Sequence, residues 1–263
     1  MGRAVPLAIL TVWSGLLCAG CNGALSPEAQ RLLQDARQAS AAGDDRAVLR
    51  HADAFLAAHG GTSAVAEVLY LRGLAGLRTG RTDAAGQDLQ RAARLAETEE
   101  LRAKALSALG DLQYDSGQWP LALESYAAAL AQDAEPRPDG TDRALYRLGE
   151  LLQRQGRWAE ADEQFDRLVH LYEGSAWARR AAGRIRGRAW TLLVAAHADR
   201  SRAEALAEQL RAAGRPAEVR AALIENRPEF RVQSGRYPTY DQAAKALADV
   251  RRDAPRARVS PTR

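Results

Sequence analysis

Arginine and glutamine side chains alternate with apolar or small residues close to the C-terminus. The segment 230–237 reads FRVQSGRY. Successive side chains of a strand point to opposite faces, so Arg231 and Gln233 share one face. Arginine forms paired hydrogen bonds with carboxylates, and glutamine bonds hydroxyl or acetamido groups. The pattern predicts a polar face suited to a ligand with such groups; a merely solvated face is the alternative.

Two strand–helix–strand units must position these side chains. The expected elements, in chain order, are a strand over 190–196, a helix over 201–213 with Ser201 as its N-cap, strands over 217–224 and 230–237, a helix over 240–252 and a strand over 257–259. This order predicts a small α+β domain (βαβ-βαβ, ferredoxin-like or RNP-like). Both helices cover one face of its sheet and the other face stays open.

The segment 230–237 and the helix that opens around Tyr240 resemble the signature half of a SPOR domain, and the resemblance covers residues 189–262. SPOR domains are envelope modules that bind peptidoglycan, preferentially glycan strands stripped of their peptides. The first half departs from the family, because Leu193 and His197 stand where the family has Gln and Phe. The resemblance implies a glycan-binding site formed by Arg220, Arg231, Gln233, Arg236, Tyr237 and Arg258, in which arginines meet lactyl carboxylates and Tyr237 stacks on a sugar ring.

An RNA-recognition domain would share this fold and a basic charge. Residues 188–263 hold 15 basic and 9 acidic side chains, although the whole chain has a net charge of only +4. RNA recognition needs stacking aromatics in the middle of two central strands. This chain has Leu193 and Gln233 there, so we expect no nucleic-acid partner.

The middle of the chain is built from repeats. Glycines seven residues apart recur at 73 and 80, at 110 and 117, and at 149 and 156, and the last two pairs precede a Trp, an Ala and an aromatic residue. This pattern resembles the tetratricopeptide repeat, a pair of packed helices. We expect four helix pairs and a capping helix over 175–186, which together form a superhelix with a concave groove for a partner protein.

Two local expectations follow from the repeat. Gly110 is expected to lie against Ala122, where the helices of one pair approach closely. Gly117 and Gly156 are expected at the turns between helices, where a positive φ favours glycine. The aromatic residue of each pair is expected to fill the gap toward the next pair.

The two cysteines of the chain both lie near its N-terminus. Arg3 precedes an apolar run, 4–17, that at about 1.5 Å per residue is too short for a ~30 Å hydrocarbon core. Such a leader is typical of a signal peptide. Residues 16–21, LLCAGC, resemble a bacterial lipobox, which implies a lipid on Cys21; Asn22 after it favours the outer membrane, facing the periplasm. Cleavage without lipidation is the alternative.

Catalytic and metal-binding patterns are missing from the sequence. The four histidines, at 51, 59, 170 and 197, lack metal-ligand spacing, and no phosphate loop follows a strand. We therefore expect a protein that is not an enzyme and needs no cofactor and no metal.

The expected organisation is a signal peptide over 1–21, a tetratricopeptide-repeat array with its cap over 22–187 and a SPOR-like domain over 188–263, which makes the fold mainly α. Together the resemblances imply a lipid-anchored envelope scaffold. Its SPOR-like domain would bind denuded glycan strands and its groove an unidentified envelope protein, in envelope maintenance or cell division. The alternative is a pure protein–protein assembly scaffold whose degenerate SPOR-like domain does not bind glycan.

Overall fold

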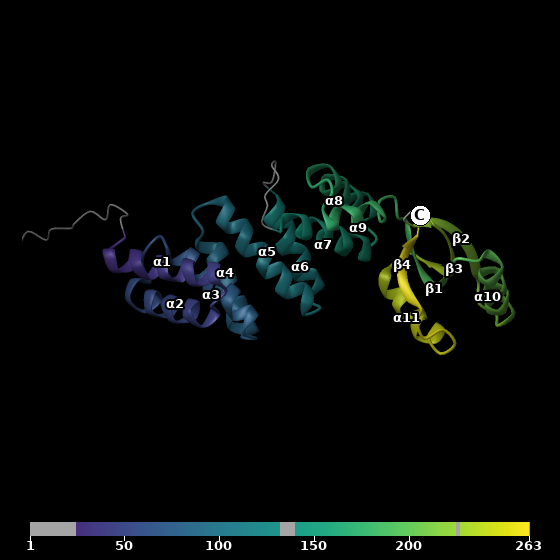
Figure 1. The fold of residues 1–263 in the computed structure, drawn as a ribbon, viewed down its shortest axis with the longest axis horizontal. Helices are drawn as coiled ribbons and strands as arrows, with labels where there is room; N and C mark the ends of the chain where they lie inside the picture. Colours follow the sequence, from purple (N-terminus) through teal and green to yellow (C-terminus); the bar gives the residue numbers. More distant parts are fainter. Residues whose placement is uncertain (1–24, 132–139, 225–226, 263) are drawn as a thin grey trace, which may run out of the picture.

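The protein is described by a computed structural model for residues 25–131, 140–224 and 227–262. The expected signal peptide and Cys21 lie outside the described residues. Figure 1 shows a row of packed helices followed by a sheet with two helices. The predicted fold class, a mainly α protein with a small C-terminal α+β domain, is confirmed.

Helix pairs with short internal turns form the first two thirds of the chain (Figure 1). The four pairs are α1 (Pro27–Ala42) with α2 (Asp45–His59), α3 (Val65–Arg78) with α4 (Thr82–Leu95), α5 (Glu99–Asp115) with α6 (Trp119–Leu130), and α7 (Thr141–Arg154) with α8 (Trp158–Leu171). At the turns of the last two pairs, Gly117 and Gly156 have φ of 73° and 79°, as expected.

The capping helix α9 (Ala176–Ala182) is shorter than the expected 175–186. Its N-cap is Ser175, whose side chain accepts a hydrogen bond from the backbone N–H of Ala178. Beyond its end, Arg186 has a φ of 63°, which lies in the left-handed region and cannot belong to a right-handed α-helix. The backbone N–H of Arg186 donates to a carboxylate oxygen of Asp162 at 2.9 Å, and this contact holds the turn.

Each of the last three helix pairs closes over a glycine of its first helix. A Cβ on Gly110 would lie 2.8 Å from Cε1 of Tyr126, and Gly73 and Gly149 face Leu89 and Phe165 in the same way. The expectation that Gly110 lies against Ala122 is therefore wrong. Helical side chains lean toward the helix N-terminus, so the Tyr126 ring extends over the turn that contains Ala122 and fills the space opposite Gly110.

The Tyr126 hydroxyl connects the third helix pair to the fourth. It donates to Asp111 Oδ1 at 2.6 Å and accepts from Arg147 of α7 at 3.2 Å, and Arg147 also donates to the Asp111 carboxylate at 2.8 Å. Burial and the Asp111 charge raise the pKa of Tyr126 well above its ordinary value. The phenol thus stays neutral and keeps donating its hydrogen bond.

The C-terminal domain is a four-stranded antiparallel sheet with two helices. Its elements are β1 (Ala189–His197), α10 (Arg200–Ala212), β2 (Ala217–Ile224), β3 (Arg227–Tyr237), α11 (Tyr240–Val250) and β4 (Arg258–Thr262), with the strand order β2-β3-β1-β4. The expected N-cap Ser201 is wrong, because Asp199 accepts the free N–H groups of the first turn of α10. Within the described part of the domain, this arrangement is the predicted βαβ-βαβ order.

A methyl group on Gly110 tests the close packing of the helix pairs. Gly110→Ala places a Cβ 2.8 Å from Cε1 of the Tyr126 ring, which is too close for ordinary packing, so we expect the free energy of unfolding to fall by about 1–3 kcal/mol. Chemical denaturation measures this loss. Gly61→Ala is the control, since a Cβ there meets nothing within 4 Å. Equal or higher stability of the Gly110→Ala variant would contradict the packing described.

Candidate functional site

One face of the sheet is covered by α10 and α11. Val232 in the middle of β3 is fully buried, and it belongs to the core cluster that contains Leu192 of β1, Ala207 of α10 and Ala243 of α11. Residues on either side of Val232 along β3 point to the opposite face. We call that opposite face the open face.

The strand register places predicted site residues together on the open face. Gln233 lies opposite Leu193 of β1, and Leu193 in turn lies opposite Arg258 of β4. In the neighbouring row, Arg231 lies opposite Arg220 of β2. Residues paired across strands share a face. Four of the six predicted residues, Arg220, Arg231, Gln233 and Arg258, thus occupy one surface.

Two of these arginines are engaged by carboxylates of their own strands. Nε of Arg220 lies 2.8 Å from Glu218 Oε1, and Nε of Arg231 lies 2.7 Å from Glu229 Oε1. Each glutamate stands two residues before its arginine and therefore on the same face. The open face consequently carries paired charges where the sequence analysis expected arginines facing a ligand directly.

Gln233 is the polar group at the centre of the open face. Only 7% of the residue is exposed, and its side-chain carbonyl oxygen is buried without a hydrogen-bond partner among the described residues. Leu193 opposite it is also buried and offers no polar group. A buried acceptor that lacks a donor costs about 1–3 kcal/mol. A ligand N–H or O–H that reaches this oxygen would remove that cost.

Arg236 and Tyr237 lie at the end of β3, away from the row of Gln233. Arg236 is exposed. Tyr237 is half-buried, pairs with Trp190 in the register and packs against the helix-covered core. Burial raises the pKa of its phenol. The ring lies over Gly235, where a Cβ would meet Cε2 at 2.7 Å. Tyr237 is thus held by the domain core, on the side opposite Gln233.

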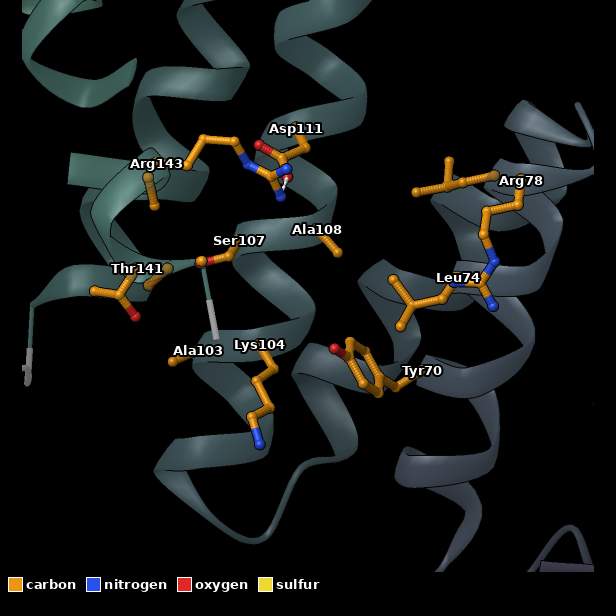
Figure 2. A pocket seen from close by; sticks show the side chains of 14 residues that line it. Tyr70, Leu74, Arg78, Ala103, Lys104, Ser107, Ala108, Asp111, Thr141 and Arg143 are labelled. Carbon is orange, nitrogen blue, oxygen red and sulfur yellow. Dashed lines mark hydrogen bonds and ion pairs between the residues drawn. The ribbon is translucent and has the colours of Figure 1, made fainter. Parts of the chain in front are cut away.

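A groove in the repeat array is a second candidate site. It has a volume of about 340 Å³ and is lined by the first helices of three successive pairs, α3, α5 and α7. Figure 2 shows Tyr70 and Leu74 on one side, Lys104 and Ser107 in the middle and Arg143 on the other side. Small side chains on α5, Ala103, Ser107 and Ala108, leave the space open.

No individual groove residue was predicted from the sequence. The repeat spacing predicted a groove, and a signal for its floor was present. Ala103 and Ser107 lie four residues apart on one face of α5 and Ala108 follows Ser107 directly, and larger residues at these positions would fill the space. Each cationic side chain of the groove lining pairs with a carboxylate: Arg143 with Asp111 (Figure 2), Arg78 with Asp45 and Lys104 with Glu100.

In residues 25–131, 140–224 and 227–262, no helix is both long and apolar enough to cross a membrane. The same ranges contain no group of three or more His, Cys, Asp or Glu side chains placed to hold a metal ion.

Comparisons with solved structures return tetratricopeptide proteins. A tetratricopeptide repeat protein from Parabacteroides merdae has a TM-score of 0.51 and 16% identity, and the match covers 88% of this chain and 68% of that one. MamA has a TM-score of 0.46 and 23% identity, with 55% of this chain and 78% of that chain covered. YrrB, described as having an unusual peptide-binding site, has a TM-score of 0.48 and 21% identity, with 59% and 74% covered. The first of these supports the fold.

Family models match two segments of the chain. No curated protein matches it. A tetratricopeptide-repeat model matches residues 101–174, and a SPOR-domain model matches residues 187–258. The chain therefore carries a tetratricopeptide-repeat region followed by a C-terminal SPOR domain.

Proposed function

We propose that the protein is an envelope scaffold that binds peptidoglycan glycan strands through the open face of its SPOR domain and a partner protein through its groove. SPOR domains bind peptidoglycan and tetratricopeptide repeats bind peptides, and neither family is catalytic. The observation that carries the glycan assignment is the buried, unpaired carbonyl oxygen of Gln233 on the open face.

Glycan chemistry fits this face. The acetamido N–H and the hydroxyl groups of a sugar are donors that Gln233 can accept, and a lactyl carboxylate can bind arginine. Because the Gln233 oxygen is buried, a ligand reaches it only after neighbouring side chains move aside. Long charged side chains, such as that of Arg231, can move in this way because they are only partly buried. The glutamates also compete with the ligand for the arginines.

Anchoring belongs to the same proposal. A lipid on Cys21 would attach the protein to the outer membrane and place both binding surfaces in the periplasm, between membrane and wall. Two or three acyl chains hold a protein durably, whereas one holds it only marginally. The scaffold would tether the membrane to peptidoglycan or bring its partner to places where the wall is remodelled during envelope maintenance or division.

The competing function is a pure assembly scaffold whose SPOR domain does not bind glycan. Leu193 and His197, which replace the Gln and Phe of the family pattern, favour it. Co-sedimentation of the full chain carrying Cys21→Ser with membrane-free sacculi separates the two. Sedimentation above that of an unrelated protein of similar charge supports glycan binding, and its absence supports the pure scaffold.

Replacing Gln233 tests the acceptor at the centre of the open face. We expect Gln233→Ala to weaken sacculus binding about two- to tenfold, since one hydrogen bond contributes ~0.5–1.5 kcal/mol. Gln209→Ala is the matched control, because Gln209 is exposed on α10. Binding of Gln233→Ala at the level of the control would exclude this residue from the site.

Replacing Glu229 tests the competition for arginine. Glu229→Gln removes the carboxylate that holds Arg231, so we expect sacculus binding to tighten by up to about fivefold, in line with the ~0.2–1 kcal/mol of a partly exposed pair. The salt dependence should also become steeper, because exposed charges are screened over ~8–10 Å. Glu208→Gln on α10 is the control. Weaker binding of Glu229→Gln would show that the glutamate itself contacts the ligand.

Replacing Cys21 tests the anchor. Cys21→Ser removes the only acceptor for the lipid at the end of the lipobox-like segment. We expect the protein to leave the membrane fraction or to keep its leader uncleaved, as read by fractionation and by the mass of the product. Normal cleavage together with unchanged membrane attachment would rule out a lipid on Cys21.

A further inference from the structure

The last helix pair of the array is covered by two different parts of the chain. Helix α9 packs on it but has only 7 residues, about half the length of the preceding helices. The SPOR domain contacts the same pair through Trp190 of β1, which packs on Trp158 of α8, and through α11, which contacts α7. Repeat arrays need a terminal cap, because the last repeat otherwise exposes the face on which another repeat would pack.

Trp190 of β1 lies at the centre of this contact. Only 2% of the residue is exposed. Its ring centroid lies 5.6 Å from that of Trp158 on α8 and 5.2 Å from that of Tyr240 on α11. Its Nε1–H donates to the backbone oxygen of Gln153 at 3.1 Å. That carbonyl lies in the last turn of α7, where carbonyls lack helical partners. One indole therefore belongs to both the SPOR core and the end of the array.

Arg154, the last residue of α7, is held between two aromatic rings. Its Cζ lies 3.4 Å from the centroid of the Trp119 ring and 3.8 Å from that of Tyr240. Trp119 begins α6 of the array, whereas Tyr240 begins α11 of the SPOR domain. A guanidinium attracts the face of each ring, and the attraction depends on its position over the ring. Rotation of the SPOR domain would break this stack, which we call the Arg154 clamp.

Asp162 on α8 fixes the segment that joins the two parts. One carboxylate oxygen accepts from the backbone N–H of Arg186, and the other from Nη1 of Arg188 at 2.8 Å. The backbone N–H of Arg188 donates to the carbonyl of Thr262, in β4, at 2.9 Å. The joining segment is therefore bound at both ends and does not act as a free linker.

We propose that the SPOR domain is the C-terminal cap of the repeat array and is held on it in one orientation. Domains of one chain move relative to each other unless their interface is extensive and specific. Here a shared buried indole, the Arg154 clamp and the Asp162 contacts hold the junction at three places. The open face and the groove then keep a fixed relative geometry. That consequence alone rests on the proposed function.

A distance distribution between the two parts tests the proposal. The full chain carrying Cys18→Ser and Cys21→Ser receives two spin labels, at Asp166→Cys on α8 and Gln209→Cys on α10, both exposed positions. Pulsed electron–electron double resonance should give one narrow distribution of the distance between the two labels. Adding Arg154→Ala should broaden it at least about twofold, as expected for domains released from a specific interface.

Arg157→Ala is the matched control, because Arg157 is also near the end of α7 but pairs only locally with Glu160. It should leave the distribution narrow. A broad distribution in the parent chain overturns the proposal. So does a distribution that stays narrow in both Arg154→Ala and Tyr240→Ala while circular dichroism shows that these variants are folded.

Calorimetry provides a second readout that does not depend on glycan binding. A docked cap unfolds together with the fourth helix pair, so the parent should lose both in one transition. Arg154→Ala should split off a transition for the SPOR domain. Separate transitions in the parent would overturn the proposal, whereas failure of sacculus binding would leave it standing and overturn only the proposed function.

Discussion

The indole of Trp190 has to be buried from two directions at once. On one side it is part of the core beneath the SPOR sheet, and on the other it packs on Trp158 and bonds the end of α7. A large aromatic ring contributes much apolar burial, and its N–H needs a partner when buried. The array supplies that partner through Gln153. The position of the sheet, and thus of its open face, follows from this requirement.

The open face exists because both helices of the domain pack on the same side of the sheet. Two helices cover one side of a four-stranded sheet, so the other side must be made compatible with water or with a ligand. The chain does this with the pairs Glu218–Arg220 and Glu229–Arg231, which balance each other's charge. Gln233 is the exception, since its oxygen is buried yet unpaired. An unsatisfied polar group in a well-packed protein calls for an explanation, and a ligand provides one.

The alternation of residues along the strands predicted which side chains share the open face, whereas contacts between different elements did not follow from it. Alternation along 230–237 placed Arg231 and Gln233 on one face, and the register confirms that placement. Glu218 and Glu229 stand two residues before Arg220 and Arg231, so the same alternation also places them on that face beside the arginines. The facing residue of Gly110 could not be predicted from spacing, because it depends on how the Tyr126 side chain leans.

The junction between the repeat array and the SPOR domain could not be predicted from the sequence either. The apolar run around Trp190 predicted a buried strand, but an apolar residue does not specify which surface buries it. The array and the SPOR-like segment were therefore predicted as separate domains. The contacts of Arg154 could not be predicted either, since an arginine at the C-terminal end of a helix is common and favourable without any further partner.

The most direct question about this protein is which residues a glycan strand contacts. Backbone amide shifts of the full chain carrying Cys21→Ser, titrated with a peptide-free glycan tetrasaccharide, would answer it. We expect the shifts of residues around Gln233 on β3, and of their register partners Glu218 and Leu193, to change most. Changes confined to α10 or to the groove would contradict the glycan site described here. So would the absence of any change in the SPOR domain.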